Sequence, residues 1–178
     1  MVTISEGRVR PRLWVGAIAL LLLPLVAMQF TDQVAWGPSD FLVFGAMLLG
    51  AVGSYELLTK RGAPPAGHVA AGIAIAAAFL LAWVNLAVGF IGDEGNPANL
   101  LFAGVLAVAA GGAVIARFRP GGMARAMLAT AVAQALVAAI ALTGAVGPVA
   151  VRDLLLGTAF FTVLWLASAW LFHRATRQ

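Results

Sequence analysis

The chain has 178 residues, of which 62% are apolar and 10% are charged, against roughly 45–50% and 25% in ordinary soluble domains. A mean hydropathy of +0.99 excludes a water-soluble globule, because a domain of this size leaves about a third of its unfolded surface exposed to water. The scarcity of charge excludes intrinsic disorder, and the absence of cysteine excludes disulfide scaffolds, thiolate metal sites and cysteine nucleophiles.

Six apolar runs follow one another along the chain, each about as long as a helix that crosses the hydrocarbon of a bilayer. They cover residues 13–30, 41–58, 69–92, 100–116, 126–147 and 154–172. We therefore predict an all-α polytopic membrane protein with six transmembrane helices. The whole chain, 1–178, forms one integral membrane domain in this prediction, with tails at 1–12 and 173–178.

The first run follows three arginines and resembles a signal peptide in that respect: Arg8, Arg10 and Arg12. It is longer than the 7–15 residues of a usual signal-peptide core, and no A-x-A-like cleavage site follows it. We expect this segment to be retained as the first span.

Six crossings place ten of the eleven Lys and Arg residues on one side of the bilayer. They are Arg8, Arg10, Arg12, Lys60, Arg61, Arg117, Arg119, Arg125, Arg174 and Arg177, with Arg152 on the other side. The positive-inside rule then puts both termini in the cytoplasm. No basic run approaches the five to eight residues of a nucleic-acid patch, so we expect the lipid bilayer as the partner and no nucleic acid.

The chain also contains an internal repeat. Residues 38–62 align without a gap on residues 97–121 when the sequence is shifted by 59 positions, and a weaker third copy begins at Pro148. The coinciding pairs include Pro38 with Pro97, Asp40 with Asn99, Gly45 with Gly104, and Gly53 with Gly112. The unit is one helical hairpin, used three times.

The repeat assigns structural roles to two sets of residues. Each copy places a short oxygen-bearing side chain just before a descending span, where it would cap the helix: Asp40, Asn99 and Asp153. Glycines recur at eight-residue spacing on two descending spans, where small residues let helices pack closely: Gly45, Gly53, Gly104 and Gly112.

Three stretches carry a resemblance to known proteins: MQFTDQVAWGPSDF, WVNLAVGFIGDEGNPANL and ARFRPGGMARAM. Together they resemble a family of small uncharacterised bacterial integral membrane proteins with no established activity. The resemblance implies a multi-pass protein of the bacterial inner membrane, and it implies no catalytic residue and no cofactor.

An ionisable or strongly polar residue inside a span is a functional hypothesis, because the bilayer makes it costly. Glu56, Asn85 and Gln134 are such residues and are candidates for a transport path. The alternative is structural. Glu56 would pair with Lys60 at the interface, and the two amides would bond between helices.

The outer connections are rich in oxygen ligands, which hard cations such as calcium prefer. Asp32, Asp93 and Glu94 are candidate metal ligands, although their spacing does not follow the twelve-residue calcium loop. His68 and His173 both fall at cytoplasmic boundaries, where they are either haem ligands or two separate interfacial side chains.

No catalytic motif occurs in the sequence, since there is no H-E-x-x-H, G-x-S-x-G or Walker loop. We expect a non-catalytic accessory or scaffolding protein that associates in the bilayer with a membrane protein partner or with copies of itself. The first alternative is a small transporter or channel for protons, cations or a small solute. The second is an enzyme acting on lipid at the outer face through Asp93 and Glu94.

Overall fold

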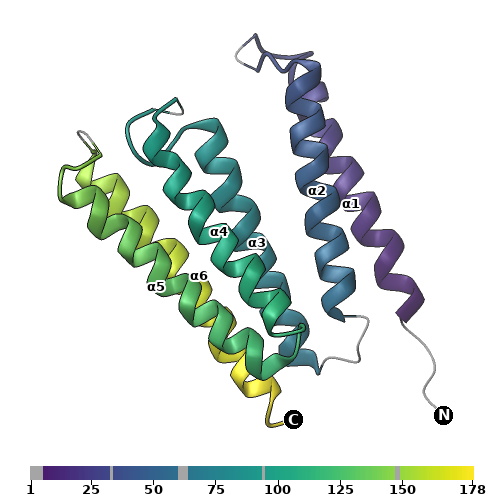
Figure 1. The fold of residues 1–178 in the computed structure, drawn as a ribbon. Coiled ribbons are helices and arrows are strands. Elements are labelled where there is room, and N and C mark those ends of the chain that lie inside the picture. Colours follow the sequence, from purple (N-terminus) through teal and green to yellow (C-terminus); the bar gives the residue numbers. More distant parts are fainter. Residues whose placement is uncertain (1–5, 33, 60–63, 94, 147–148) are drawn as a thin grey trace. The chain divides into compact units, whose positions relative to one another are not determined.

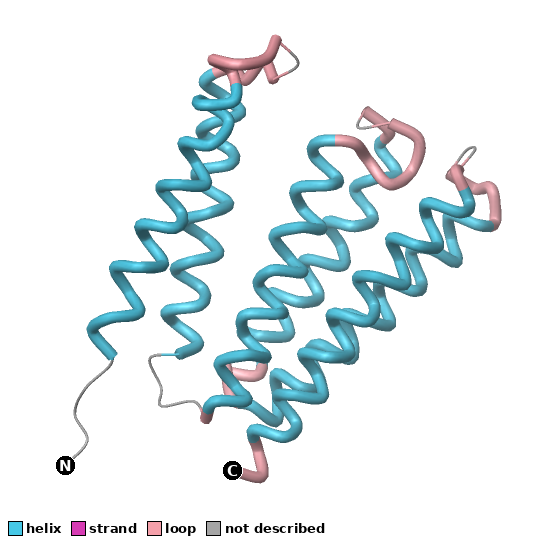
Figure 2. Tube along the Cα trace, turned by 180° about the vertical axis from the view of Figure 1, so that it is seen from behind, coloured by secondary structure: helices cyan, strands magenta, loops and turns pink. Residues whose placement is uncertain are grey.

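The computed structural model describes residues 6–32, 34–59, 64–93, 95–146 and 149–178. Within these ranges the chain is helical and contains no strand. The elements are α1 (Glu6–Ala27), α2 (Pro38–Thr59), α3 (Pro65–Ala87), the 3-10 helix η1 (Pro97–Asn99), α4 (Leu100–Ile115), α5 (Pro120–Leu142) and α6 (Val151–Ala175). Figures 1 and 2 show these helices, with α1 running beside α2.

Proline occupies the first position of several helical elements. Four of the seven helical elements begin at a proline, namely Pro38, Pro65, Pro97 and Pro120. Proline suits this position because its missing N–H would have no intrahelical partner and its fixed φ is already helical. Pro38 and Pro97, which coincide in the sequence repeat, each start a helical element.

Five helices are long and apolar enough to cross a membrane: α2, α3, the η1–α4 segment Pro97–Ile115, α5 and α6. The apolar part of α1, Pro11–Ala27, is a shorter helix, near the roughly 17-residue lower limit for a span. The all-helical character predicted from the sequence is therefore confirmed in the described residues. Five of the helices have the length and composition of membrane spans, which is consistent with a multi-pass protein, and the sixth is shorter.

The helix bounds differ from the apolar runs in both directions. Helix α5 starts at Pro120 and α6 ends at Ala175, both outside their runs, whereas α3 ends at Ala87, inside the run 69–92. Hydropathy measures contact with hydrocarbon, but a helix continues until a cap or a turn stops it. After α3 the stop comes from Gly89, whose φ is +77°, in the left-handed region that glycine readily adopts.

The chain divides into two compact units, Met1–Leu57 and Leu58–Gln178. The first unit is the antiparallel hairpin of α1 and α2. Trp14 Nε1 donates to Glu56 Oε1 at 3.1 Å near one end of this hairpin, and a Cβ added at Gly45 would lie 3.8 Å from Leu21 farther along it. Within residues 11–27 of α1, most large side chains are exposed, as Val15 and Leu23 are.

The second unit is the four-helix bundle of α3, α4, α5 and α6. Its core is formed by fully buried side chains that include Trp165, Phe102, Leu81, Ile91 and Met123. Helix α6 packs against both α5 and α3, and Ser168 Oγ donates to Ala70 O of α3 at 2.9 Å. Most of the arginines of the bundle lie at one end, and its described aspartates lie at the other.

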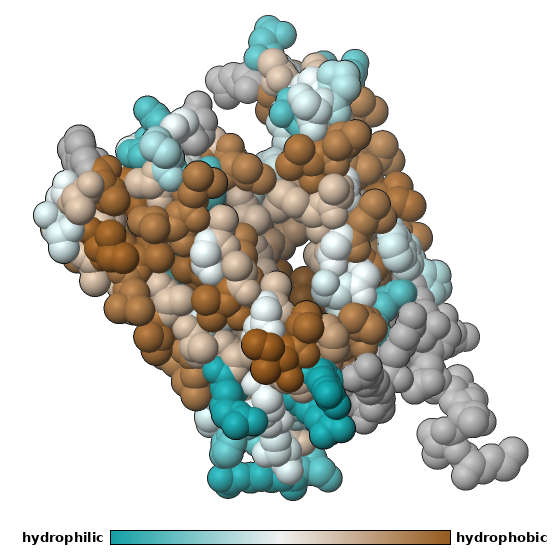
Figure 3. Space-filling view, viewed as in Figure 1, coloured by the Kyte–Doolittle hydropathy of each residue, from teal (hydrophilic) through white to brown (hydrophobic). Residues whose placement is uncertain are grey.

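One end of the bundle is basic. It comprises the end of α4, the start of α5 and the end of α6, and it carries Arg117, Arg119, Arg125, Arg174 and Arg177. The other end carries Asp93 and Asp153 with Arg152. Figure 3 shows hydrophobic surface along the helices and hydrophilic groups toward their ends. This distribution is typical of helices that contact lipid along their length and water at their termini.

Candidate functional site

The connection between α3 and α4 is an ordered turn held by one side chain. Asn99 Oδ1 accepts from the backbone N–H groups of Phe90 and Ile91, both at 2.9 Å. Asn99 Nδ2 donates to the carbonyls of Ile91 at 3.3 Å and Asp93 at 2.7 Å. Asn99 is buried, so these bonds satisfy an amide that would otherwise lack water. Asn99 therefore acts as a clamp on the preceding loop.

Glycine is required within this clamp. A Cβ added at Gly89 would lie 2.5 Å from the carbonyl oxygen of Asp93 and 2.7 Å from Asn99 Nδ2. The residue also has a positive φ, which a side chain would disfavour. The close approach of Gly89 is what allows Asn99 to reach the loop carbonyls.

An aromatic side chain anchors the same loop to the bundle. The Phe90 ring lies 5.1 Å from the Phe102 ring of α4 and 5.7 Å from the Phe161 ring of α6, measured between centroids. It packs against Gly157 of α6, where a Cβ would clash with it. These contacts fall in the distance range of favourable aromatic pairs, so the loop is tied to two helices and held in one position.

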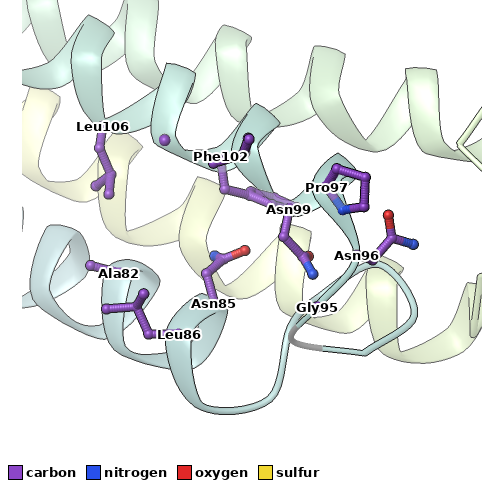
Figure 4. A pocket seen from close by; sticks show the side chains of 11 residues that line it. Ala82, Asn85, Leu86, Gly95, Asn96, Pro97, Asn99, Phe102 and Leu106 are labelled. Carbon is purple, nitrogen blue, oxygen red and sulfur yellow. The ribbon is translucent and has the colours of Figure 1, made fainter. Parts of the chain in front are cut away.

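A pocket lies between this loop, α3 and α4 (Figure 4). Its volume is about 450 Å³, and its lining includes Asn85, Asn96 and Asn99 together with Leu86, Leu100, Phe102 and Leu106. The Asn85 Nδ2 group donates to Leu81 O of its own helix at 2.8 Å. Its Oδ1 is buried and has no hydrogen-bond partner.

The chemistry of this pocket is neutral. None of the described residues that line it carries a charged side chain, and Asp93 interacts with the clamp through its backbone carbonyl. The walls are apolar apart from the amides. The pocket therefore suits a small uncharged group with a hydrogen-bond donor for Asn85, and it presents no nucleophile or general base.

A second set of polar groups lies inside the bundle. Gln134 of α5 is fully buried, and neither amide atom of its side chain has a hydrogen-bond partner. The hydroxyls of Thr158 and Thr162 and the indole nitrogen of Trp165, all on α6, are likewise buried and unpartnered. By contrast, Thr130 Oγ1 donates to Ala126 O at 2.9 Å. Each buried polar group without a partner calls for a physical explanation, because its desolvation is not offset.

The predicted transport-path residues fall in both units. Glu56 belongs to the first unit, where it accepts from Trp14, while Asn85 and Gln134 belong to the second. The Trp14 bond gives Glu56 a role in holding α1 against α2. The expected Glu56–Lys60 pair involves Lys60, which lies outside the described residues.

The candidate metal ligands are also divided. Asp32 belongs to the first unit and Asp93 to the second, and both are exposed; Glu94 lies outside the described residues. Among the residues that the structure describes, no group of three or more His, Cys, Asp or Glu side chains could hold a metal ion.

Each of the two histidines interacts within its own helix end. His68 Nδ1 lies 3.2 Å from Pro64 O, and His173 Nε2 lies 3.1 Å from Arg177 Nη2.

The four glycines predicted to pack helices occupy different surroundings. A Cβ at Gly112 would lie 2.7 Å from the Cβ of Ala126, so α4 and α5 approach closely there. Gly45 faces Leu21 of α1. Gly53 and Gly104 have no neighbouring atom within 4 Å of an added Cβ, so each faces open space in the structure.

The three predicted caps also differ from one another in their hydrogen bonds and in their positions relative to the helix start. Asp40 Oδ2 accepts from Gly37 N at 2.7 Å, so the third residue of α2 bonds back to the residue before the helix, as in a capping box. Asn99 precedes α4, but its side chain makes no bond to the start of that helix. Asn96 instead caps η1 by accepting from Ala98 N at 2.9 Å. Asp153 lies in the first turn of α6, whose N-cap residue is Ala150.

Asn99 departs from its predicted cap role because the 3-10 turn η1 comes between the loop and α4. This turn moves the capping position forward to Asn96 and leaves the Asn99 side chain directed toward the loop. Phe90 was not among the predicted site residues. The signal for it in the sequence is its position between Gly89 and Gly92.

In comparisons with known proteins, no family model, no curated protein and no solved structure matches the chain.

Proposed function

We propose that this protein is a non-catalytic component of a bacterial inner membrane that crosses the bilayer six times as three helical hairpins, with both termini in the cytoplasm. It acts by lateral association with a helix of another membrane protein or of a second copy. The observation that carries this proposal is a row of small, exposed residues on the side of α4 that points away from the bundle core. We call it the α4 face, and it consists of Ala103, Gly104, Ala107, Ala110 and Gly111.

The α4 face is exposed along its length. Ala103, Ala107 and Gly111 follow one another at four-residue spacing, and Gly104 and Gly111 have open space where a Cβ would be. The larger exposed side chains of α4 are Leu100 at one end, Val114 and Ile115 at the other, and Val108, 37% exposed, about one turn from both Gly104 and Gly111. The five small residues of the α4 face leave the backbone beside Val108 accessible to a second helix.

The physical basis is the weakness of other driving forces in lipid. Helices in a bilayer gain little from burying apolar surface, because lipid tails are equally apolar, so they associate where small residues allow close van der Waals contact. The opposite side of α4 already uses this contact, since Gly112 packs against Ala126 of α5. The α4 face offers the same chemistry to a partner outside the bundle.

Site-specific photocrosslinking in the native membrane tests the proposal. A photoreactive residue replaces Ala107 on the α4 face, and the matched control replaces Ala139, an exposed alanine of α5. We expect Ala107 to form an adduct with another polypeptide and Ala139 to form none. Adducts only with lipid, or only within the same chain, would remove the α4 face as a lateral surface.

The unpartnered groups of the bundle favour a second candidate, a path for a small neutral solute. Gln134, Thr158 and Thr162 together offer donors and acceptors inside α5 and α6, and none of them carries a charge. A neutral set of this kind favours an uncharged solute over a proton relay, which needs titratable groups.

Solute flux into reconstituted vesicles checks this candidate, with glycerol as the probe. The protein should accelerate glycerol entry over empty vesicles, and Gln134→Leu should slow it at least about tenfold if the amide replaces hydration. Entry no faster than in empty vesicles rules the path out for this solute.

A further inference from the structure

We propose that the basic end of the bundle binds one anionic glycerophospholipid in a groove between the start of α5 and the end of α6. The groove has a volume of about 860 Å³ and is lined by Arg119, Arg125, Leu128, Leu166, Trp170 and His173, among others. This volume is within the usual range of small-molecule sites. The inference is independent of the proposed lateral association.

Charge is the first observation. Arg119 and Arg125 line the groove, and Arg174 and Arg177 lie at the end of α6 beside it. None of the described residues that line the groove is a carboxylate. Asp93 and Asp153, the acids described in the α3–α6 unit, lie at its opposite end. The excess of positive charge at the groove therefore suits an anion.

The backbone strengthens the same preference. Helix α5 starts at Pro120, its first turn carries no acidic residue, and its N-cap Arg119 makes no side-chain bond to the helix. Gly121 and Gly122, which also line the groove, are in the first turn, where amide groups have no intrahelical acceptor. Anions bind favourably at such a helix start.

The arrangement of polar and apolar residues along the helices identifies a lipid. Arg125 faces the groove near the helix end, and Leu128 faces it one turn deeper along α5. On α6, Leu166 likewise lies one turn deeper than Trp170. A lipid phosphate would thus lie at the arginines, and its acyl chains would lie along the leucines deeper in the groove. A free anion has no apolar part to occupy this deeper region.

The α6 side of the groove is held in place by two contacts. The Arg174 guanidinium carbon lies 3.8 Å from the centroid of the Trp170 ring, a cation–π geometry. Arg177 Nη2 lies 3.1 Å from His173 Nε2. With Arg177 donating, His173 Nε2 is the acceptor of this contact.

Tryptophan quenching by brominated lipid tests the proposal on the full-length protein in neutral detergent. The probe is phosphatidylglycerol with dibrominated acyl chains, compared with phosphatidylcholine carrying the same chains. We expect the anionic lipid to quench at lower concentration, and we expect its additional quenching to disappear in Trp170→Phe. Equal quenching by both lipids would overturn the proposal, because it indicates unselective contact with lipid.

Charge variants locate the binding site. The double variant Arg119→Gln with Arg125→Gln should lower the affinity for the anionic lipid about 25-fold, or about fivefold per arginine. The matched control is Arg152→Gln, which removes one charge at the opposite end of the same bundle and should leave binding unchanged. Full affinity in the double variant would refute the site.

Two measurements on the unmodified chain keep the proposal testable if the variants fold poorly. Added salt should reduce the preference for phosphatidylglycerol, because screening weakens attraction between exposed charges. Glycerol phosphate, the headgroup without chains, should not displace the brominated lipid at equal concentration. Displacement with equal affinity would show a free-anion site and overturn the assignment to a lipid.

Discussion

Asn99 satisfies four backbone groups of the α3–α4 loop with one side chain, two as acceptor and two as donor. Buried amides that lose such partners keep their desolvation penalty without compensation. The loop conformation, and with it the shape of the neighbouring pocket, therefore depends on this residue more than on any charged group near it.

Replacing Asn99 should open the loop. Asn99→Ala leaves the N–H groups of Phe90 and Ile91 without an acceptor, and we expect a loss of about 2–4 kcal/mol of unfolding free energy. Hydrogen exchange checks this directly, because protection of these two amides should fall. The control Asn96→Ala removes one cap bond and should cost only about 1 kcal/mol; equal effects of the two variants would contradict the clamp.

Gln134 allows a prediction of opposite sign. Its side-chain amide is buried without a partner, so replacing it with an apolar side chain of similar size removes a desolvation cost. Gln134→Leu should raise the unfolding free energy by about 1–2 kcal/mol. Equilibrium unfolding in mixed detergent micelles measures the change. A loss of stability would mean that the amide has partners, such as bound water, in the protein.

Two glycines of α4 coincide with two of α2 in the repeat, yet their surroundings differ. Gly112 packs against Ala126 of α5, while Gly104 faces open space. The sequence pattern identified both as packing residues because spacing alone reports which face they share. Which partner lies against that face depends on the helix that packs there, and the repeat contains no information about it.

The difference between these glycines can be measured on one helix. Gly112→Ala should cost about 1–3 kcal/mol, because the added methyl meets Ala126 in a closely packed contact. Gly104→Ala should raise the unfolding free energy by about 0.5–1 kcal/mol, because alanine favours a helix interior over glycine and the added methyl meets no neighbour. If the two variants lose equal stability, the α4–α5 contact is not where the structure places it.

The helices themselves were largely predictable. Apolar runs located all six, because hydrocarbon contact requires continuous apolar sequence. The turn at Gly89 and the start at Pro120 were not obtained from the runs, since local backbone geometry sets helix ends. The capping bond of Asp40 follows from its position near a helix start. The loop clamp of Asn99 and the docking of Phe90 depend on tertiary contacts across α4 and α6 and could not be derived from spacing.

At the scale of the whole molecule, charge distribution is the clearest feature. The α3–α6 bundle carries its arginines at the end formed by α4, α5 and α6 termini, and Asp93 and Asp153 at the other. Such segregation is what the positive-inside rule describes for membrane helices. Helix α1 decides between five and six crossings. Its apolar segment, Pro11–Ala27, is shorter than the other five candidate spans.

Cysteine labelling from outside intact cells measures whether the chain crosses the bilayer six times. The natural chain has no cysteine, so Ser5→Cys, Gly95→Cys and Arg177→Cys each introduce a single reporter for an impermeant maleimide. Six crossings predict that Gly95→Cys reacts, and that Ser5→Cys and Arg177→Cys react only after the membrane is opened. Reaction of Ser5→Cys in intact cells while Arg177→Cys stays protected would mean five crossings and would rule out six.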